Sequence, residues 1–270
     1  MAETAFPVND IRHLVALVFW LLFSATTPAD VISYLRFEGD ATDETGLMNG
    51  EMIDFTNPEV EGWSGDVFAP TIPLTGESNT GSVRFAGGSE FIDLSNNNDL
   101  SLGTNFTVEF FLKPDNPVIV SSIFGFAPQS GLYLSLWSVD ESLNLRGEFQ
   151  GQIDTLIPVP TMETGTWCHV ALVVQPSEYS IYLDGGLTYN GPLPSGGEGP
   201  YFFPGTDITG DRTIGGESGT WRGWIDEVRI SDTALTPDQF LIAVPEPGTL
   251  FLCFSGLAAL FLSWLKRRFG

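Results

Sequence analysis

The segment Phe106-Thr-Val-Glu-Phe-Phe-Leu-Lys-Pro114 alternates its side chains with the two-residue period of a β-strand. One face of this strand would carry the apolar residues Phe106, Val108, Phe110 and Leu112. The other face would carry Thr107, Glu109, Phe111 and Lys113. A strand with one apolar and one largely polar face is typical of an antiparallel sheet that covers a core on one side only. The segment therefore predicts a half-buried antiparallel strand.

Similar segments recur on both sides, separated by breaks rich in Gly, Asn and Pro. The sequence predicts further strands at residues 31–37, 83–85, 91–94, 119–126, 132–137, 143–149, 167–174, 179–183 and 224–230. The only helical signal is a short turn at residues 236–240, where Thr236 can cap the turn and Pro237 takes its first position. Many strands with almost no helix predict an all-β, two-sheet antiparallel sandwich over residues 30–240.

The first 29 residues have the parts of a secretory signal peptide. An apolar run at residues 14–23 follows a polar start, and small residues then lead to Ala29, after which cleavage fits best. The polar start is long and carries Glu3 and Asp10, so an uncleaved signal anchor is the alternative. Both interpretations predict that the rest of the chain is exported.

The other end of the chain combines Pro245-Glu246-Pro247 with an uncharged, mostly apolar run at residues 250–265 and a basic end, Lys266-Arg-Arg268. The run is near the lower length limit for a transmembrane helix, and the basic end would stay in the cytoplasm. The two prolines keep the preceding segment extended, as a processing peptidase requires. We therefore predict a transmembrane helix at 250–265 inside a removable tail at 244–270, with a permanent single-pass anchor as the alternative.

This tail resembles the PEP-CTERM sorting signal of Gram-negative bacteria, in which Pro-Glu-Pro, a short apolar span and an Arg-rich end follow one another. The resemblance implies an exosortase-type membrane peptidase as a partner. It also implies an exported protein that is first anchored in the inner membrane and then reaches the cell surface, the outer envelope or the extracellular matrix.

Three further segments carry a second resemblance, and they are Tyr34-Leu-Arg-Phe-Glu-Gly-Asp40, Trp167-Cys-His-Val-Ala-Leu-Val-Val174 and Trp224-Ile-Asp-Glu-Val-Arg-Ile-Ser231. Together with residues 106–114 they resemble a laminin-G-like domain. The resemblance implies a concanavalin A-like jelly roll over residues 30–240. Domains of this kind often bind calcium, which makes calcium an expected cofactor.

The charge of the chain is strongly negative, with 34 acidic and 11 basic residues and a formal net charge of −23. Four of the basic and three of the acidic residues lie in the two terminal segments, which leaves 31 acidic and seven basic residues between them. Such a surface repels nucleic acid, because nucleic-acid binding needs a basic footprint. The acidity favours either solubility of an exported protein or binding of divalent cations.

A cation site is the best chemical hypothesis that the sequence offers. Asp40 and Asp43 lie in one glycine-bounded loop, and clustered oxygen atoms are the ligands that calcium prefers. Asp226 would share the strand face of Val228, which we expect to be the core face, so its carboxylate needs a hydrogen bond, an ion pair or a metal. Pairing of the first and last strands would bring Asp226 near the loop after Phe37. The candidate calcium ligands are Asp40, Asp43 and Asp226, and a solvated loop beside a hydrogen-bonded Asp226 is the alternative.

Patterns that would indicate catalysis are absent from the sequence. The string Glu-x-Asp-x-x-Glu of jelly-roll glycoside hydrolases does not occur, and adjacent acids such as Asp226 and Glu227 would point to opposite faces of a strand. His169 shares a strand face with Trp167, which favours a structural role. Cys168 lies in the same strand pattern, has no partner for a disulfide within the domain, and fits a small buried apolar residue. We therefore predict a binding protein rather than an enzyme.

Aromatic side chains in a Gly- and Pro-rich stretch suggest a ligand-binding surface. The candidates are Tyr201, Phe202 and Trp221, whose rings could stack on sugars or pack beneath their own loop. Analogy at the level of the fold favours carbohydrate, such as an extracellular polysaccharide, or a surface protein as the ligand. A structural or interaction protein of the envelope or biofilm without a sugar ligand is the alternative, and a polysaccharide-active enzyme ranks third.

Overall fold

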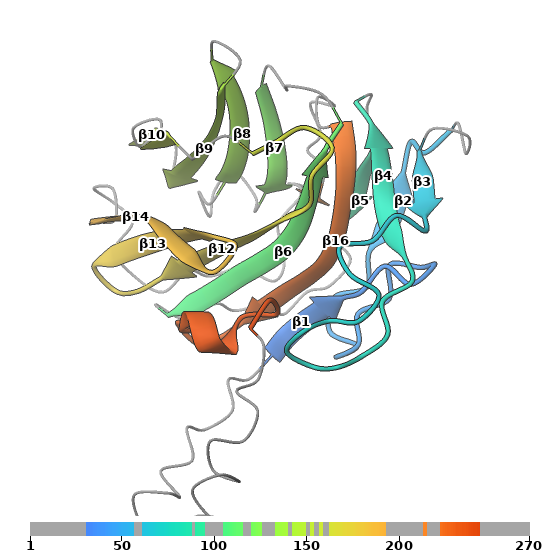
Figure 1. Ribbon diagram of the computed structural model, residues 1–270, viewed down its shortest axis with the longest axis horizontal. Helices are drawn as coiled ribbons and strands as arrows, with labels where there is room; N and C mark the ends of the chain where they lie inside the picture. The colour runs from blue at the N-terminus through green and yellow to red at the C-terminus, as the bar shows by residue number, and fades with distance from the viewer. Residues whose placement is uncertain are drawn as a thin grey trace, which may run out of the picture. The chain divides into compact units, whose positions relative to one another are not determined.

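The fold is seen in a computed structural model of the 270-residue chain (Figure 1). The described residues all belong to one of its two compact units, Val31–Gly270. Backbone and side chains are described for residues 31–56, 61–87, 90–94, 105–115, 162–192 and 222–243. The backbone alone is described for the strand residues 120–125, 133–139, 142–149, 152–153, 157–158 and 213–214.

Most described strands with known side chains belong to one antiparallel sheet, here called sheet A. Its order is β14 (Gly186–Pro192), β13 (Glu178–Leu183), β12 (Cys168–Val174), β6 (Phe106–Pro114), β16 (Arg222–Ser231), β4 (Ser82–Ala86) and β3 (Gly62–Ser64). The first strand of the described chain, β1 (Val31–Leu35), also pairs with β16. Pairing of the first and last strands is therefore confirmed.

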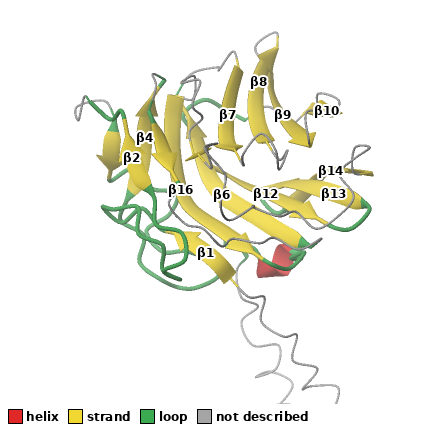
Figure 2. Cartoon of the chain, turned by 180° about the vertical axis from the view of Figure 1, so that it is seen from behind, coloured by secondary structure: helices red, strands yellow, loops and turns green. Residues whose placement is uncertain are grey.

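A second antiparallel sheet, sheet B, forms the other layer (Figure 2). Its order is β10 (Gln152–Ile153), β9 (Ser142–Phe149), β8 (Tyr133–Val139), β7 (Val120–Gly125), β15 (Thr213–Ile214), β5 (Phe91–Asp93) and β2 (Glu51–Ile53), with β11 (Ile157–Pro158) paired to β9. The described residues contain no α-helix and one short 3-10 helix, η1 (Pro237–Gln239), which Thr236 precedes as expected. The prediction of an all-β, two-sheet sandwich is confirmed.

The main core lies between the two sheets and follows the predicted alternation. The side chains of β6 that point inward, Phe106, Val108, Phe110 and Leu112, all belong to this core. Neighbouring strands of sheet A add Val170, Leu172, Ile225 and Ile230, and sheet B contributes Ile92. Burial of this apolar surface supplies the main favourable free energy of folding. Cys168 is buried and free, so no disulfide contributes at this position.

The opposite, outer face of sheet A is also covered, which corrects the prediction of a half-buried strand. Thr107, Glu109 and Phe111 of β6 are fully buried although they face away from the main core. A second apolar cluster lies on this face and consists of Tyr34, Ile72, Phe111 and Leu241, with Phe68, Trp167 and Ile242 packed against it. The segments around residues 66–80 and 235–243 therefore cover the outer face, and the strand pattern alone could not show this.

The last strand, β16, changes its partner along its length. Residues 222–225 pair with β4 and residues 228–231 pair with β1, while β6 follows the other edge. A β-bulge lies at the change, because the register against β6 shifts between Asp226 and Arg229. Glu227 within the bulge has a φ of 52°, in the left-handed region that a side chain rarely occupies.

The bulge corrects two predictions about the acidic pair. Val228 faces the core as expected, but Asp226 lies opposite Phe111 and therefore points to the outer face. Glu227 contacts Arg36 on the same outer side. Because the extra residue of the bulge resets the alternation, both carboxylates lie on one side of the sheet and do not point to opposite faces.

Candidate functional site

Asp43, one of the predicted calcium ligands, organises the loop that follows β1. Its carboxylate is buried and accepts five hydrogen bonds of 2.6–3.1 Å, from the backbone N–H groups of Tyr34, Thr45, Leu47 and Met48 and from the hydroxyl of Thr45. Both oxygen atoms of Asp43 are thus occupied by the loop itself. Asp40 is exposed, and its Oδ1 accepts the N–H of Thr42 at 2.9 Å.

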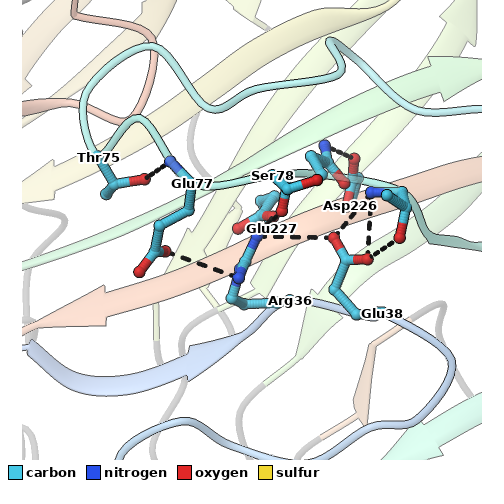
Figure 3. Close-up of polar contacts among 9 residues, drawn as sticks. Arg36, Glu38, Thr75, Glu77, Ser78, Asp226 and Glu227 are labelled. Atoms are coloured by element: carbon cyan, nitrogen blue, oxygen red, sulfur yellow. Dashed lines mark hydrogen bonds and ion pairs between the residues drawn. The ribbon is translucent and has the colours of Figure 1, made fainter.

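The third predicted ligand, Asp226, lies with Glu227 where β1, β4 and β16 meet; we call this place the acidic junction (Figure 3). Both side chains are fully buried. The Nδ2 group of Asn79 donates to Asp226 Oδ2 at 2.8 Å, and Arg36 Nε donates to Glu227 Oε1 at 3.3 Å. Within 3.5 Å, Asp226 Oδ1, Glu227 Oε2 and Asn79 Oδ1 have no hydrogen bond among the described residues, but the Tyr34 hydroxyl and the Phe68 backbone lie near enough to Glu227 and Asp226 to lower their pKa values.

Arg36 is the cation at the acidic junction and it serves several acceptors (Figure 3). Its guanidinium donates to the carbonyl of Ser78 and forms ion pairs with Glu38 at 3.6 Å and Glu77 at 3.7 Å. It thereby ties the covering loop at residues 77–78 to the end of β1. One guanidinium shared among several carboxylates does not neutralise them all, which leaves the junction short of positive charge.

The buried carboxylates of the acidic junction hold their protons more tightly than usual. Burial raises the pKa of Asp226 to about 8, and the nearby charge of Glu227 adds to this rise, while the hydrogen bond from Asn79 opposes it. Burial also raises the pKa of Glu227 to about 7, although Arg36 opposes the rise. Near neutral pH the junction therefore holds protons that exposed carboxylates would have released.

Pairing of β1 with β16, with Leu35 opposite Val228, brings the loop after Phe37 toward Asp226, as the sequence predicted, and the charge of Glu38 in that loop adds slightly to the rise in the pKa of Asp226. Within the described part of the chain, no group of three or more His, Cys, Asp or Glu side chains is placed to hold a metal ion. The calcium site therefore stays a prediction, and a calcium-dependent rise in melting temperature that is lost in Asp226→Asn would support it.

A pocket of about 490 Å³ lies at one end of sheet A, between the segment before β12 and the β13–β14 hairpin. We call it the hairpin pocket. Its lining residues are Met162, Glu163, Thr166, Trp167, Cys168, Leu183, Asp184, Gly186, Leu187 and Thr188. Its volume falls in the range of small-molecule sites, and its lining combines apolar side chains with a few polar groups, as such sites do.

Backbone hydrogen bonds fix both walls of the hairpin pocket. Asp184 N donates to the carbonyl of His169 at 2.9 Å, and His169 N donates to Asp184 Oδ1 at 2.8 Å, so the turn of the hairpin is tied to β12. On the other wall, Gly165 N donates to the carbonyl of Pro114 at 2.7 Å. The indole Nε1 of Trp167 donates to Asp66 Oδ1 at 3.1 Å, which sets the orientation of the ring. The pocket is therefore preformed.

A buried ion cluster on the outer face of sheet A includes the predicted structural histidine. His169 Nε2 lies 2.8 Å from Glu109 Oε2, and Arg229 Nε donates to Glu109 Oε1 at 2.7 Å. Burial alone would raise the pKa of Glu109, but the hydrogen bond from His169 and the charge of Arg229 outweigh burial and lower it. Leu241 N and the carbonyl of Gln239 complete the cluster. Glu109 thus joins β6 to β12, β16 and the segment after η1, and His169, its partner on β12, does not line the hairpin pocket.

Several predicted residues fall outside the described residues. They are the candidate ligand-binding residues Tyr201, Phe202 and Trp221 and the sorting motif Pro245, Glu246 and Pro247. The predicted signal peptide at 1–29 and the predicted membrane span at 250–265 also lie outside them. Within the described ranges, no helix has the length and apolar character needed to span a bilayer.

The hairpin pocket was missed by sequence reasoning because its residues come from segments that look unremarkable one by one. The sequence predicts strands at residues 167–174 and 179–183 and gives no role to Asp184. One signal was usable. Because β12 and β13 form an antiparallel hairpin, the turn that follows β13 must lie near the start of β12. Sequence alone could not show that a cavity remains between them.

Comparison with known protein families gives two matches. Residues 86–240 match the concanavalin A-like lectin/glucanases superfamily, and residues 243–268 match the PEP-CTERM protein-sorting motif. Among curated proteins, no sequence relative matches the chain. The sorting motif indicates an exported protein that is processed at the membrane, as in Gram-negative bacteria.

Solved structures share the fold at low sequence identity. Domain 4 of an extracellular arabinanase from Geobacillus stearothermophilus is 19% identical, with a TM-score of 0.55 over 78% of this chain and 97% of that one. The binding domain of botulinum neurotoxin serotype D is 15% identical, with a TM-score of 0.52 over 78% of this chain and 50% of that one. The binding domain of Paraclostridial Mosquitocidal Protein 1 is also 15% identical, with a TM-score of 0.51, and again only half of that chain is covered. With more than half of its length matched by the family and both sheets of the sandwich in place, the chain belongs to the concanavalin A-like lectin/glucanases superfamily and carries a PEP-CTERM sorting motif.

Proposed function

We propose that this protein is an exported carbohydrate-binding protein that acts at the cell surface or in the extracellular matrix. The hairpin pocket is the observation that carries the proposal. Its lining residues include Trp167, whose side chain also packs against the outer apolar cluster, and the hydroxyl- or carboxyl-bearing residues Thr166, Thr188, Glu163 and Asp184. An aromatic face with a few polar groups suits a sugar, which has an apolar ring surface and hydroxyls around it.

Two of the structurally similar proteins support a sugar ligand. The arabinanase domain 4 was determined in complex with arabinotriose. The ligand-binding domain of botulinum neurotoxin serotype D, 16% identical with a TM-score of 0.51, was determined with N-acetylneuraminic acid. These ligands belong to those proteins, and the likeness to them extends to the fold alone. The arabinanase domain carries more of this support, because 97% of its chain is covered and only 50% of the neurotoxin chain is.

A glycan array probed with the processed protein, or with the full chain in detergent, tests the proposal. We expect binding to a restricted set of saccharides, and we expect Leu187→Arg to abolish it by placing a long charged side chain at the pocket. Leu187 is 58% exposed, so this change should not disturb packing. The matched control is Leu47→Arg, because Leu47 is 59% exposed and does not line the pocket.

A structural or interaction protein without a sugar ligand is the second candidate function. The exported, sorted character of the chain and its acidic surface suit this role as well. An array on which no saccharide binds, together with retention of the protein in envelope or matrix fractions, would favour it. Binding that is equal in the Leu187→Arg variant would place the sugar site elsewhere on the domain.

We also propose that an exosortase-type peptidase removes the sorting tail, so that the mature protein leaves the inner membrane. The match of residues 243–268 to the sorting motif supports this step. The partner of the tail is then a membrane enzyme, and the partner of the sandwich is a polysaccharide outside the membrane.

A further inference from the structure

The hairpin pocket has a one-sided charge. Among its ten lining residues, Glu163 and Asp184 are acidic and none is basic. Lys113 is linked to the pocket through Asp66. It forms an ion pair with Asp66, and Asp66 also accepts the hydrogen bond of the pocket residue Trp167. No unpaired cation of the lining therefore offsets the two carboxylates.

The negative charge reaches the base of the hairpin pocket. Burial is the main cause that raises the pKa of the Cys168 thiol, and the charge of Asp184 raises it further. The thiol of Cys168 and the thioether of Met162 lie together, with their sulfur atoms 3.0 Å apart, and both residues are buried. A ligand that enters the pocket meets an apolar base and a negative field.

The apolar part of the pocket limits what kind of cation would fit. The apolar lining residues Met162, Leu183 and Leu187 offer contacts to carbon-bound hydrogen atoms and not to a hydrated ion. A small hydrated metal ion would leave these contacts unused, and an acidic sugar would be repelled by Glu163 and Asp184. A sugar ring that bears an ammonium group satisfies both halves of the pocket, since its ring face packs on apolar atoms and its charge meets the carboxylates.

We propose that the hairpin pocket selects saccharides that carry a free, protonated amino group, with Glu163 and Asp184 as the residues that determine this specificity. The inference rests on the proposed carbohydrate-binding function and names the class of sugar. The pocket would then bind a polysaccharide of partly unacetylated amino sugars in preference to neutral and acidic polysaccharides.

Calorimetric titration with a matched pair of ligands tests the inference. One ligand is the tetramer of glucosamine and the other is the tetramer of N-acetylglucosamine, which has the same backbone and a capped, uncharged nitrogen. Titrations run at a slightly acidic pH, where the amine is protonated. We expect the free-amine tetramer to bind more tightly, and we expect added salt to weaken this preference because exposed charges are screened.

Two conservative substitutions isolate the role of charge. Asp184→Asn keeps an oxygen that can accept the N–H of His169 and keeps a residue type that tolerates the left-handed φ of 48° at this position. Glu163→Gln changes an exposed side chain without changing its size. We expect each substitution to weaken binding of the free-amine tetramer about two- to fivefold, and we expect the double substitution to remove the preference. Glu44→Gln, an exposed acid outside the pocket, is the control and should change nothing.

The outcomes separate this inference from the proposed function. Equal binding of both tetramers, or a preference that survives the double substitution, overturns the inference. Binding on the array to neutral or acidic sugars only would also overturn it, while the carbohydrate-binding function would stand. If no saccharide of any charge binds, both the function and the inference fail.

Discussion

Asp226 carries a proton in the folded protein over a pH range in which an unfolded chain would release it. The pKa of Asp226 is about 8 in the fold and near 4 in an unfolded chain. Between these values the folded state binds more protons, so the free energy of unfolding decreases as pH rises, by up to about 1.4 kcal/mol per pH unit. The contribution of protonated Asp226 to the free energy of unfolding is fully present below pH ~4 and is lost by pH ~8.

Asp226→Asn should therefore flatten the dependence of stability on pH. We expect the variant to be more stable than the wild type at pH 8 and to lose less stability between pH 5 and pH 8. Urea denaturation at both pH values measures this, with the exposed Asp232→Asn as the control. An unchanged slope in the Asp226 variant would show that the carboxylate is already ionised in the fold.

Cys168 gives a second prediction for a single residue. Burial and the charge of Asp184 both disfavour its thiolate, which is the reactive form. We expect Cys168 in the folded protein to resist iodoacetamide at pH 8 and to react at once when the domain is unfolded in urea, as the mass of the peptide that contains Cys168 would show. Rapid alkylation of the folded protein would mean that the hairpin pocket opens to its base.

The residue scale is also where the sequence was least informative. Alternation placed Val228 correctly, yet it misplaced Asp226, because a bulge has no signature in a run of otherwise regular strand residues. The bulge depends on the change of partner from β4 to β1, and that change is a property of the whole sheet. Glu163 and Asp184 were missed because the pocket that they line forms only where the segment before β12 and the β13–β14 hairpin pack together.

At the scale of elements, strands with a clear apolar pattern were predictable, including the three-residue β5 (Phe91–Asp93), whereas several very short strands and the polar β14 were not. β6 has the bounds that the sequence indicated, and β12, β13 and β16 agree within a few residues. β3, β10 and β15 have only two or three residues, too few for a period to show. β14 carries exposed and polar residues between two glycines, so its pairing with β13 defines it better than its composition does.

The segment after η1 is attached to sheet A through the buried cluster of Glu109 and Arg229. Arg229→Ala would leave Glu109 buried without its guanidinium partner, and we expect this to lower the free energy of unfolding by about 3–5 kcal/mol. Because Glu109→Gln removes the stranded charge, the double variant should recover part of the loss. Guanidinium chloride denaturation of both variants measures these changes. A loss below about 1 kcal/mol in the single variant would mean that water, not protein, solvates Glu109.

At the scale of the whole molecule, the fold class and the sorting motif could be read from the sequence because both rest on local patterns. The hairpin pocket could not, because it is a cavity formed by two segments that are separate in the sequence. The sorting tail gives the prediction at this scale. We expect the native protein to lack about its last 25 residues and to appear outside the inner membrane.

Intact-mass measurement of the protein from its own cells decides whether the tail is removed. Replacement of Pro245, Glu246 and Pro247 by alanine should leave the full-length chain in the membrane fraction. A native species that still ends at Gly270 would instead show a permanent single-pass anchor.

The position of β16 has a consequence for the order of events during export. It is paired with β6 along one edge and with β4 and β1 along the other, so sheet A stays divided until β16 arrives. A chain that crosses a membrane from its N-terminus delivers β16 last of all the strands. Sheet A cannot be completed before residues 222–231 have crossed the membrane. We therefore expect the chain to stay unfolded, as translocation requires, until export is almost complete. The arrival of β16 therefore sets when the domain can complete its folding.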